Sequence, residues 1–195
     1  MAEFFKVFCD GATRGNNIKG SMRYGSFGSV VLDSNNDIKY TTKLGFEGKE
    51  VTNNRMEMIA LIYSVSMVLK YNLGKKIEIE VNTDSQILHK GINDWMTGWK
   101  KRGWKKSNGK TIENKDLWLV IDDLFKIDDL DLRTKWVKGH VKLTEGASLE
   151  TIYNNRVDEL ANEVLDDGQT HEDLSGTISN IQKFIDEVKG SDSND

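Results

Sequence analysis

Short apolar runs separated by polar turns dominate the first part of the chain. Residues 4–10 form a mostly apolar run, and residues 24–32 and 38–46 form two more that contain aromatic and β-branched side chains. Residues 34–37, Ser-Asn-Asn-Asp, are typical of a tight turn between the last two. This pattern predicts an antiparallel meander of three strands.

The apolar spacing changes to that of a helix after residue 52, where a stripe runs from Met56 to Leu69. Thr52 or Asn53 is a candidate N-cap for this helix, and Gly74 follows its end. Farther along, the pattern predicts a half-buried strand over 77–82, helices over 86–99 and 114–127, a last strand over 132–137 and a last core helix over 156–165.

Strands followed by helices that alternate with strands are typical of a layered α/β domain with a mixed sheet. We therefore predict a single domain over residues 1–167, with a five-stranded sheet of antiparallel N-terminal strands plus parallel strands, flanked by helices. Residues 168–195 are acidic and polar, and we expect a partly disordered tail. Ile178, Ile181 and Ile185 fit one short amphipathic helix that docks on the domain or stays disordered.

The composition says more about the cellular compartment of the protein than about its function. The 195 residues are 37% hydrophobic and 30% charged with a net charge of −4, which is ordinary for a globular protein and does not by itself indicate a nucleic-acid partner. The single cysteine, Cys9, excludes an internal disulfide and is predicted to be a buried structural thiol. Neither a signal peptide nor a membrane span is visible, so we expect a cytoplasmic protein without a membrane partner.

Four carboxylates stand in positions that dispersed surface acids seldom occupy. Asp10 and Asp84 each end a strand-like run, whereas Glu57 and Asp158 lie on predicted helices. Any one of them, taken alone, is equally well explained as a solvated acid or a turn cap. Acids placed this way can converge on one spot, where they stay ionised together only by sharing divalent cations. Such a cluster with Mg²⁺ is the apparatus of phosphoryl transfer by two metal ions.

The sequence around these acids carries a family resemblance. Asp10 stands in Cys-Asp-Gly-Ala, Glu57 in Thr-Asn-Asn-Arg-Met-Glu, Asp84 in Asn-Thr-Asp-Ser-Gln and Asp158 in Asn-Arg-Val-Asp-Glu-Leu-Ala. The chain also contains Gly-Ile-Asn-Asp-Trp, Trp-Lys-Lys-Arg-Gly-Trp-Lys, Asn-Lys-Asp-Leu-Trp and, later, Trp-Val-Lys-Gly-His. Over roughly residues 4–166 it resembles type 1 ribonuclease H, the bacterial enzyme that cuts the RNA strand of RNA–DNA hybrids, in the subgroup with a basic handle.

The resemblance implies an endoribonuclease that has no base-sequence preference and leaves 5′-phosphate and 3′-hydroxyl ends. It implies that two Mg²⁺ ions, with Mn²⁺ as a substitute, are held by Asp10, Glu57, Asp84 and Asp158. His140 would assist proton transfer or product release near the attacking water. We expect a monomer that binds the hybrid duplex and needs no protein partner, although a partner for the tail stays open.

The resemblance also assigns substrate contacts. The 2′-hydroxyl distinguishes the hybrid from duplex DNA, and the side chains that match the family's contacts to the sugar edges are Asn16, Asn53, Asn54 and Gln86. Thr52 and Asn114 match positions that bind a DNA-strand phosphate, but Glu50 stands where the family often has a basic residue. Asn16 is equally a turn residue, and Asn53 is equally a helix cap.

A basic segment over residues 95–115, the handle, interrupts a chain of negative net charge. Its cations are Lys100, Lys101, Arg102, Lys105, Lys106, Lys110 and Lys115. We predict that they track phosphates of the substrate. Three handle tryptophans either lie over the sugars of the DNA strand or pack the handle onto the body: Trp95, Trp99 and Trp104.

Two other functions remain open, namely a non-catalytic module that binds RNA–DNA hybrids and a DNA-directed nuclease of the wider superfamily. The four acids argue against the first, because a pure binder has no need of a repulsive cluster. The asparagine set and the handle argue against the second. The segment 141–153 is longer than the family's usual loop after the histidine, and it either alters the mobility of His140 or closes over the site.

Overall fold

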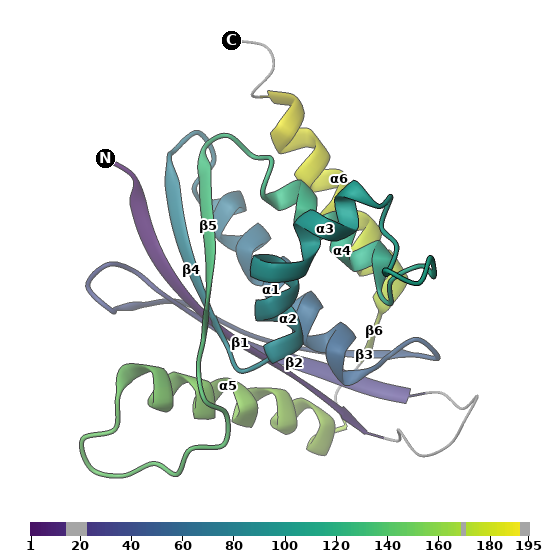
Figure 1. The fold of residues 1–195 in the computed structure, drawn as a ribbon. Coiled ribbons are helices and arrows are strands. Elements are labelled where there is room, and N and C mark those ends of the chain that lie inside the picture. The colour runs from purple at the N-terminus through teal and green to yellow at the C-terminus, as the bar shows by residue number, and fades with distance from the viewer. Residues whose placement is uncertain (15–22, 169–170, 192–195) are drawn as a thin grey trace.

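The computed structural model describes residues 1–14, 23–168 and 171–191, and a mixed sheet forms its centre (Figure 1). The strands are β1 (Glu3–Arg14), β2 (Arg23–Leu32), β3 (Ile38–Gly48), β4 (Ile77–Thr83), β5 (Leu130–Trp136) and β6 (His171–Asp173). Their order across the sheet is β5-β4-β1-β2-β3-β6. β1, β2 and β3 pair antiparallel, whereas β4 pairs parallel with both β1 and β5. The predicted α/β class with a mixed sheet is confirmed.

Helices cover both faces of the sheet (Figure 1). One face carries α1 (Asn53–Tyr71), α2 (Gln86–Lys90), the π-helical turn η1 (Gly91–Trp95), α3 (Met96–Lys101) and α4 (Lys115–Leu124), and the other carries α5 (Leu149–Asp166). The helix predicted over 86–99 is therefore interrupted by a π turn. α5 begins earlier than predicted, because the hydroxyl of Ser148 accepts the Thr151 N–H and caps it.

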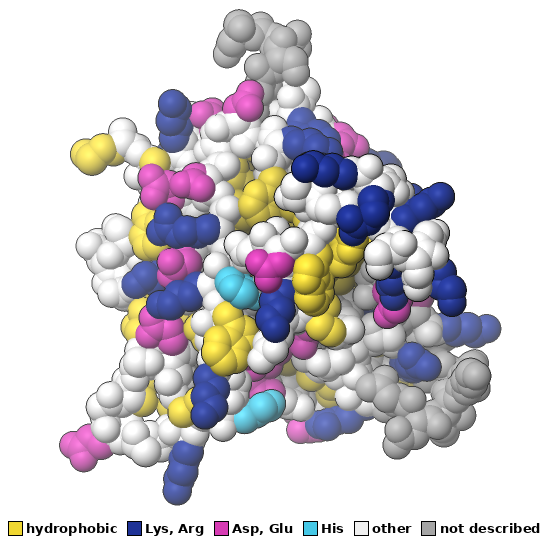
Figure 2. Space-filling view, in the orientation of Figure 1, with side chains coloured by type: hydrophobic (Ala, Val, Ile, Leu, Met, Phe, Trp, Pro, Cys, Tyr) yellow, Lys and Arg dark blue, Asp and Glu magenta, His cyan; other side chains and the backbone are white. Residues whose placement is uncertain are grey.

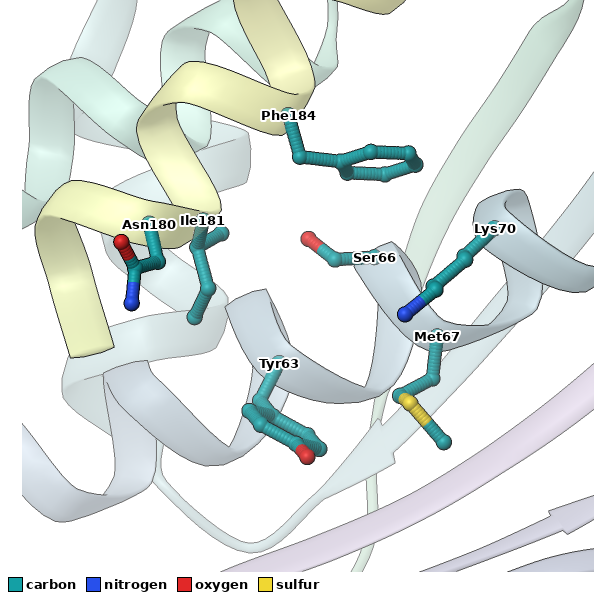
Figure 3. Close-up of a pocket in the computed structure, with 7 residues that line it drawn as sticks. All are labelled: Tyr63, Ser66, Met67, Lys70, Asn180, Ile181 and Phe184. Carbon is teal, nitrogen blue, oxygen red and sulfur yellow. The ribbon is translucent and has the colours of Figure 1, made fainter. Parts of the chain in front are cut away.

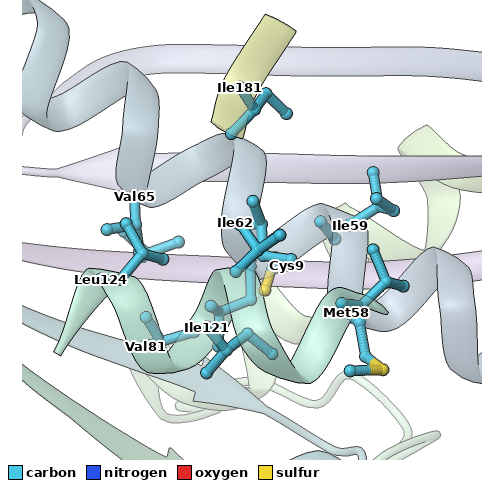
Figure 4. Packing of buried hydrophobic residues seen from close by; sticks show 14 of the residues in the cluster. Cys9, Met58, Ile59, Ile62, Val65, Val81, Ile121, Leu124 and Ile181 are labelled. Atoms are coloured by element: carbon cyan, nitrogen blue, oxygen red, sulfur yellow. The ribbon is translucent and has the colours of Figure 1, made fainter. Parts of the chain in front are cut away.

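The alternation of side chains along β1 builds two apolar cores. Val7 and Cys9 belong to the larger core, which includes α1 and α4, and Figure 4 shows Cys9 among these helices. Phe8 points to the opposite face, where it packs in a smaller core with Val157 and Leu160 of α5. Cys9 is a buried free thiol, as predicted.

The predicted count of five strands is wrong, because β6 adds a sixth to the described sheet by pairing parallel with β3. A strand of three residues has too little alternation to be recognised in a sequence. Helix α6 (Leu174–Ser191) follows directly and contacts α1 and α4. The side chains of Leu174, Ile181 and Ile185 are at most 9% exposed and join the larger core.

A pocket of about 200 Å³ lies between α1 and α6 (Figure 3). It is lined by Tyr63, Ser66, Met67, Lys70, Asn180, Ile181 and Phe184. These α1 residues belong to the half of the helix remote from Glu57. In the described part of the chain, no helix is both long and apolar enough to cross a membrane.

Candidate active site

Asp10 and Asp84 are brought together by the parallel pairing of β1 with β4. The last paired positions of this ladder are Phe8 and Asn82. Asp10 and Asp84 each follow two residues later, so the register brings them side by side. Asp84 directly follows β4, as predicted, but the prediction that the first strand ends at Asp10 is wrong, because β1 continues to Arg14 by pairing with β2.

Glu57 reaches the same place because α1 begins against β1. The hydroxyl of Thr52 accepts the Arg55 N–H and caps the helix. A Cβ added to Gly11 would lie 2.5 Å from the backbone nitrogen of Glu57, so only a glycine lets the first turn of α1 approach so closely. The Glu57 carboxylate accepts hydrogen bonds from Asn53 Nδ2 at 3.1 Å and from the Ser85 side chain.

Asp158 approaches from the opposite face on α5. Gly28 pairs with Asp10 across β1 and β2, and a Cβ added to Gly28 would lie 2.3 Å from the carbonyl oxygen of Val157. This close packing places the turn of α5 that carries Asp158 beneath Asp10. Oδ1 of Asp158 accepts a hydrogen bond from Asn162 Nδ2 at 3.0 Å.

The electrostatics show that the four carboxylates interact. The pKa of Asp10 is raised from its ordinary 3.8 to about 8, mainly by burial. The negative charge of Asp84 contributes to this rise, and those of Glu57 and Asp158 contribute less. The Gly11 N–H, which donates to Asp10 Oδ1 at 2.7 Å, opposes this shift. Burial, and then Asp84, also raise the pKa of Glu57 against the hydrogen bonds that it accepts.

The donor set suits hard divalent cations. Four carboxylates offer only oxygen ligands, which favour Mg²⁺ or Mn²⁺ over zinc. A cation would also relieve the repulsion that raises the pKa of Asp10. Among the described residues, however, no three carboxylate, histidine or thiol groups lie close enough to a common point to enclose an ion. The carboxylates would therefore have to close around it.

The loop after β5 runs directly against Asp84. A Cβ added to Gly139 would lie 2.3 Å from Asp84 Oδ2, so the backbone before His140 touches this carboxylate. His140 itself is exposed and has a left-handed backbone with φ 52°. Two further contacts were missed in the sequence: the indole N–H of Trp136 donates to the Asp84 carbonyl at 3.2 Å, and Asn154 Nδ2 donates to Asp84 Oδ2 at 3.3 Å.

Of the amide side chains predicted to contact the sugar edges, some are exposed and one bonds another side chain of the site. Gln86 is exposed beside Ser85, and Asn54 is half-buried on the first turn of α1. Asn53 bonds Glu57 rather than capping the helix, a role that Thr52 takes. The predicted contact Asn16 lies outside the described residues.

Thr52 and Asn114, the predicted phosphate contacts, lie near Arg55, a buried cation at the start of α1. Arg55 forms two hydrogen bonds with Asp116, at 2.9 and 2.7 Å, and a longer one of 3.4 Å with Asn114 Oδ1. Asn114 has a left-handed backbone with φ 54° at the start of α4. Glu50, which departs from the family pattern, is exposed.

The handle combines packed and free groups. Trp99 lies with ring centroids 5.7 Å from Trp95 and 5.1 Å from Trp118, and both Trp99 and Trp104 pack against the larger core. These contacts favour the packing interpretation for Trp99 and Trp104, whereas Trp95 is 40% exposed. Figure 2 shows Lys and Arg side chains gathered over this part of the surface.

The handle cations differ in their partners. Lys100 pairs with the buried Asp122 at 2.6 Å, and Lys106 pairs with Glu113 at 2.8 Å. Arg102 donates to the Lys105 carbonyl. Lys101 and Lys105 are exposed, and among the described residues neither has a carboxylate partner.

Comparisons with known proteins show which family the chain resembles. A family model described as RNase H matches residues 3–166. A ribonuclease H of Dechloromonas aromatica is 37% identical over 158 residues, which cover 81% of this chain and 96% of that protein. LC9-RNase H1, a type 1 RNase H with the type 2 active-site motif, is 25% identical with a TM-score of 0.66 and covers 87% of this chain and 75% of that one. LC11-RNase H1, solved with an RNA/DNA hybrid, is 20% identical with a TM-score of 0.56 and covers 85% and 99%.

Proposed function

Because the chain belongs to the ribonuclease H family and is an endoribonuclease that acts on RNA–DNA hybrids, we propose that its reaction is carried out by four carboxylates: Asp10, Glu57, Asp84 and Asp158. The observation that carries this proposal is the burial of Asp10 beside the other three acids, which raises its pKa to about 8. A carboxylate held where its own charge is disfavoured is characteristic of functional sites.

The family depends on divalent metal ions, and the ions proposed for this chain are two Mg²⁺, with Mn²⁺ as a substitute. When bound, they supply positive charge to the attacking water and to the leaving 3′ oxygen. The protein's own contribution is to orient the ligands. Asn53, Asn154 and Asn162 each hold an oxygen of one carboxylate, so that the opposite oxygens can turn toward a cation.

The proposed role of His140 is to move a proton at the attacking water or to help the product leave. Its exposure and the contact of the preceding glycine with Asp84 support this role. The expected products carry a 5′-phosphate and a 3′-hydroxyl. We expect His140 to speed the reaction without being required for it.

The hybrid would lie across the carboxylates toward the handle. Asn54 and Gln86, with Asn53 and the undescribed Asn16, are proposed to contact the sugar edges and so to sense the 2′-hydroxyl. Thr52 and Asn114 would contact a DNA-strand phosphate. The handle lysines and Trp95 would extend this surface, and the protein would act as a monomer.

The test is a panel of four matched substrates with Mg²⁺: RNA–DNA hybrid, duplex RNA, duplex DNA and single-stranded RNA. We expect cleavage of the RNA strand of the hybrid alone, abolished by EDTA and restored by added Mg²⁺. Repeating the panel with Mn²⁺ establishes which ion supports the faster rate. Binding of the hybrid without cleavage would indicate a non-catalytic module, and cleavage of DNA would indicate a DNA-directed nuclease.

A further inference from the structure

Two adjacent asparagines of α5 contact different parts of the site. Asn154 donates to the Asp84 carboxylate, whereas Asn155 Nδ2 donates to the carbonyl oxygen of Val141 at 2.9 Å. Val141 follows His140 directly. We propose that Asn155 is a positioning residue that holds the loop carrying His140 beside the carboxylates, a proposal that rests on the role given to His140 above.

Apart from the contact of Gly139 with Asp84, the loop that carries His140 is loosely packed. No side chain between residues 138 and 150 is fully buried, and residues 142–146 are all exposed. A hollow of about 240 Å³, bordered by Trp136, Val141 and Thr151 among other residues, lies beside the loop. Apolar packing, which usually fixes a segment, therefore contributes little here.

The side chain of Asn155 connects this loop to α5. Within the described ranges, its bond to Val141 is the only hydrogen bond that joins residues 138–147 to the body of the protein. The ion pair of Lys135 with Glu150 joins residues before and after the loop and contacts no residue within it. Its side chains are 47% and 35% exposed, so it restrains the loop weakly.

The side chain of Asn155 is itself held in place. The same Nδ2 donates to the carbonyl oxygen of Thr151, one turn earlier in α5, at 2.8 Å. This second bond orients the amide before it meets the loop. The hydrogen bond therefore joins α5, which also carries Asp158, to the carbonyl group of Val141, the residue after His140. The backbone of His140 is left-handed.

The inference predicts a kinetic effect that depends on His140. A neutral hydrogen bond changes a conformational population by about threefold to tenfold. Asn155→Ala and Asn155→Leu, which both lack the donor, should lower kcat on the hybrid by about this factor and leave KM nearly unchanged. In a His140→Ala background the same substitutions should have almost no effect.

A second readout needs no substrate. Hydrogen exchange of the peptide covering residues 138–147 should be faster in Asn155→Ala than in the unsubstituted protein, and exchange in the sheet should be unchanged. Asn72→Ala is the matched control, because Asn72 Nδ2 donates to the Val68 carbonyl one turn earlier at 2.9 Å, without any contact to the loop. It should leave loop exchange as it was.

An equal loss of kcat with and without His140 would show that Asn155 acts only through stability and would overturn the proposal. Unchanged loop exchange in Asn155→Ala would overturn it as well. If the unsubstituted protein cleaved no hybrid, the proposed function would fail, whereas the exchange experiment would still report on the tether.

Discussion

Two glycines and one buried acid define the site at the scale of single residues. Gly11 lets α1 touch β1, and Gly28 lets α5 touch β2, on opposite faces of the sheet at Asp10. A side chain at either position would push a helix, with Glu57 or Asp158, away from the centre. Burial of Asp10 at this junction is what makes its charge costly without a cation.

The raised pKa of Asp10 predicts how the metal-free protein responds to pH. The folded protein keeps this proton up to about pH 8, whereas the unfolded chain loses it near 3.8, so stability is present at low pH and is lost as the pH rises toward 8. In EDTA, the free energy of unfolding by urea should fall by on the order of 2 kcal/mol between pH 6 and 8.

Asp10→Asn is the control for this titration, because it keeps the size of the side chain but carries no titrating group. It should remove most of the fall. A decrease of the same size in Asp10→Asn would assign the effect to other groups.

The convergence of the four acids could be predicted from the sequence, but the groups that orient them could not. Each acid lies in a distinctive run of neighbours, which is a local signal. The bonds from Asn154 and from the Trp136 indole to Asp84 join residues far apart in the chain, and no local pattern marks them. In the sequence, Asn154 lies before the helix predicted over 156–165, so nothing marked it as a neighbour of Asp84.

At the scale of elements, the handle separates anchoring groups from free ones. Lys100 is anchored on the buried Asp122 of α4, and Trp99 packs on Trp118. Lys101, Lys105 and Lys110 are exposed. The anchored groups fix the position of the handle, and we expect the exposed lysines to meet the phosphates of the substrate.

Replacing Lys101, Lys105 and Lys110 together by Gln should weaken hybrid binding and flatten its salt dependence. Each phosphate contact that is lost should reduce the slope of log K against log salt by about 0.9. The measurement is a binding titration at several salt concentrations, with Ca²⁺ in place of Mg²⁺. Replacing Lys70, Lys76 and Lys183, which are exposed outside the handle, is the matched control. Equal slopes in the two triple variants would show that the handle does not touch phosphate.

Strands and helices with a clear apolar period could be predicted from the sequence, whereas irregular features could not. The π turn of η1 lies within a stretch whose spacing fits a continuous helix. The start of α5, by contrast, does follow the apolar period, because Leu149 and Tyr153 continue its stripe and pack against the smaller core. The prediction placed this start too late, at residue 156. Only the π turn is decided by contacts that the apolar period does not record.

At the scale of the whole molecule, the segment after α5 closes one side of the fold. β6 extends the sheet at β3, and α6 covers α1 and α4. The amphipathic stripe was visible in the sequence, but its docking was one of two alternatives there, because a short helix alone is marginal. Packing on the core is what stabilises α6.

Ile185→Ala should lower the free energy of unfolding by about 2–4 kcal/mol, because the side chain is fully buried against the core. Urea unfolding measures this change, and the cleavage rate of the remaining folded protein should not change. Ile178→Ala, at a partly buried position of the same helix, should cost less. A negligible effect of Ile185→Ala would mean that α6 does not contribute to the stability of the domain in solution.

The most direct test of the account is single-turnover cleavage of an RNA–DNA hybrid by Asp84→Asn, with hybrid binding measured in parallel. The amide keeps the shape of the side chain but removes the charge that a divalent cation needs, so we expect cleavage to fall by at least about a thousandfold while binding stays within about threefold. Asp131→Asn, at an exposed position of β5, should cleave at the unsubstituted rate. Full cleavage by Asp84→Asn would contradict the assignment of the carboxylate cluster as the site of the reaction.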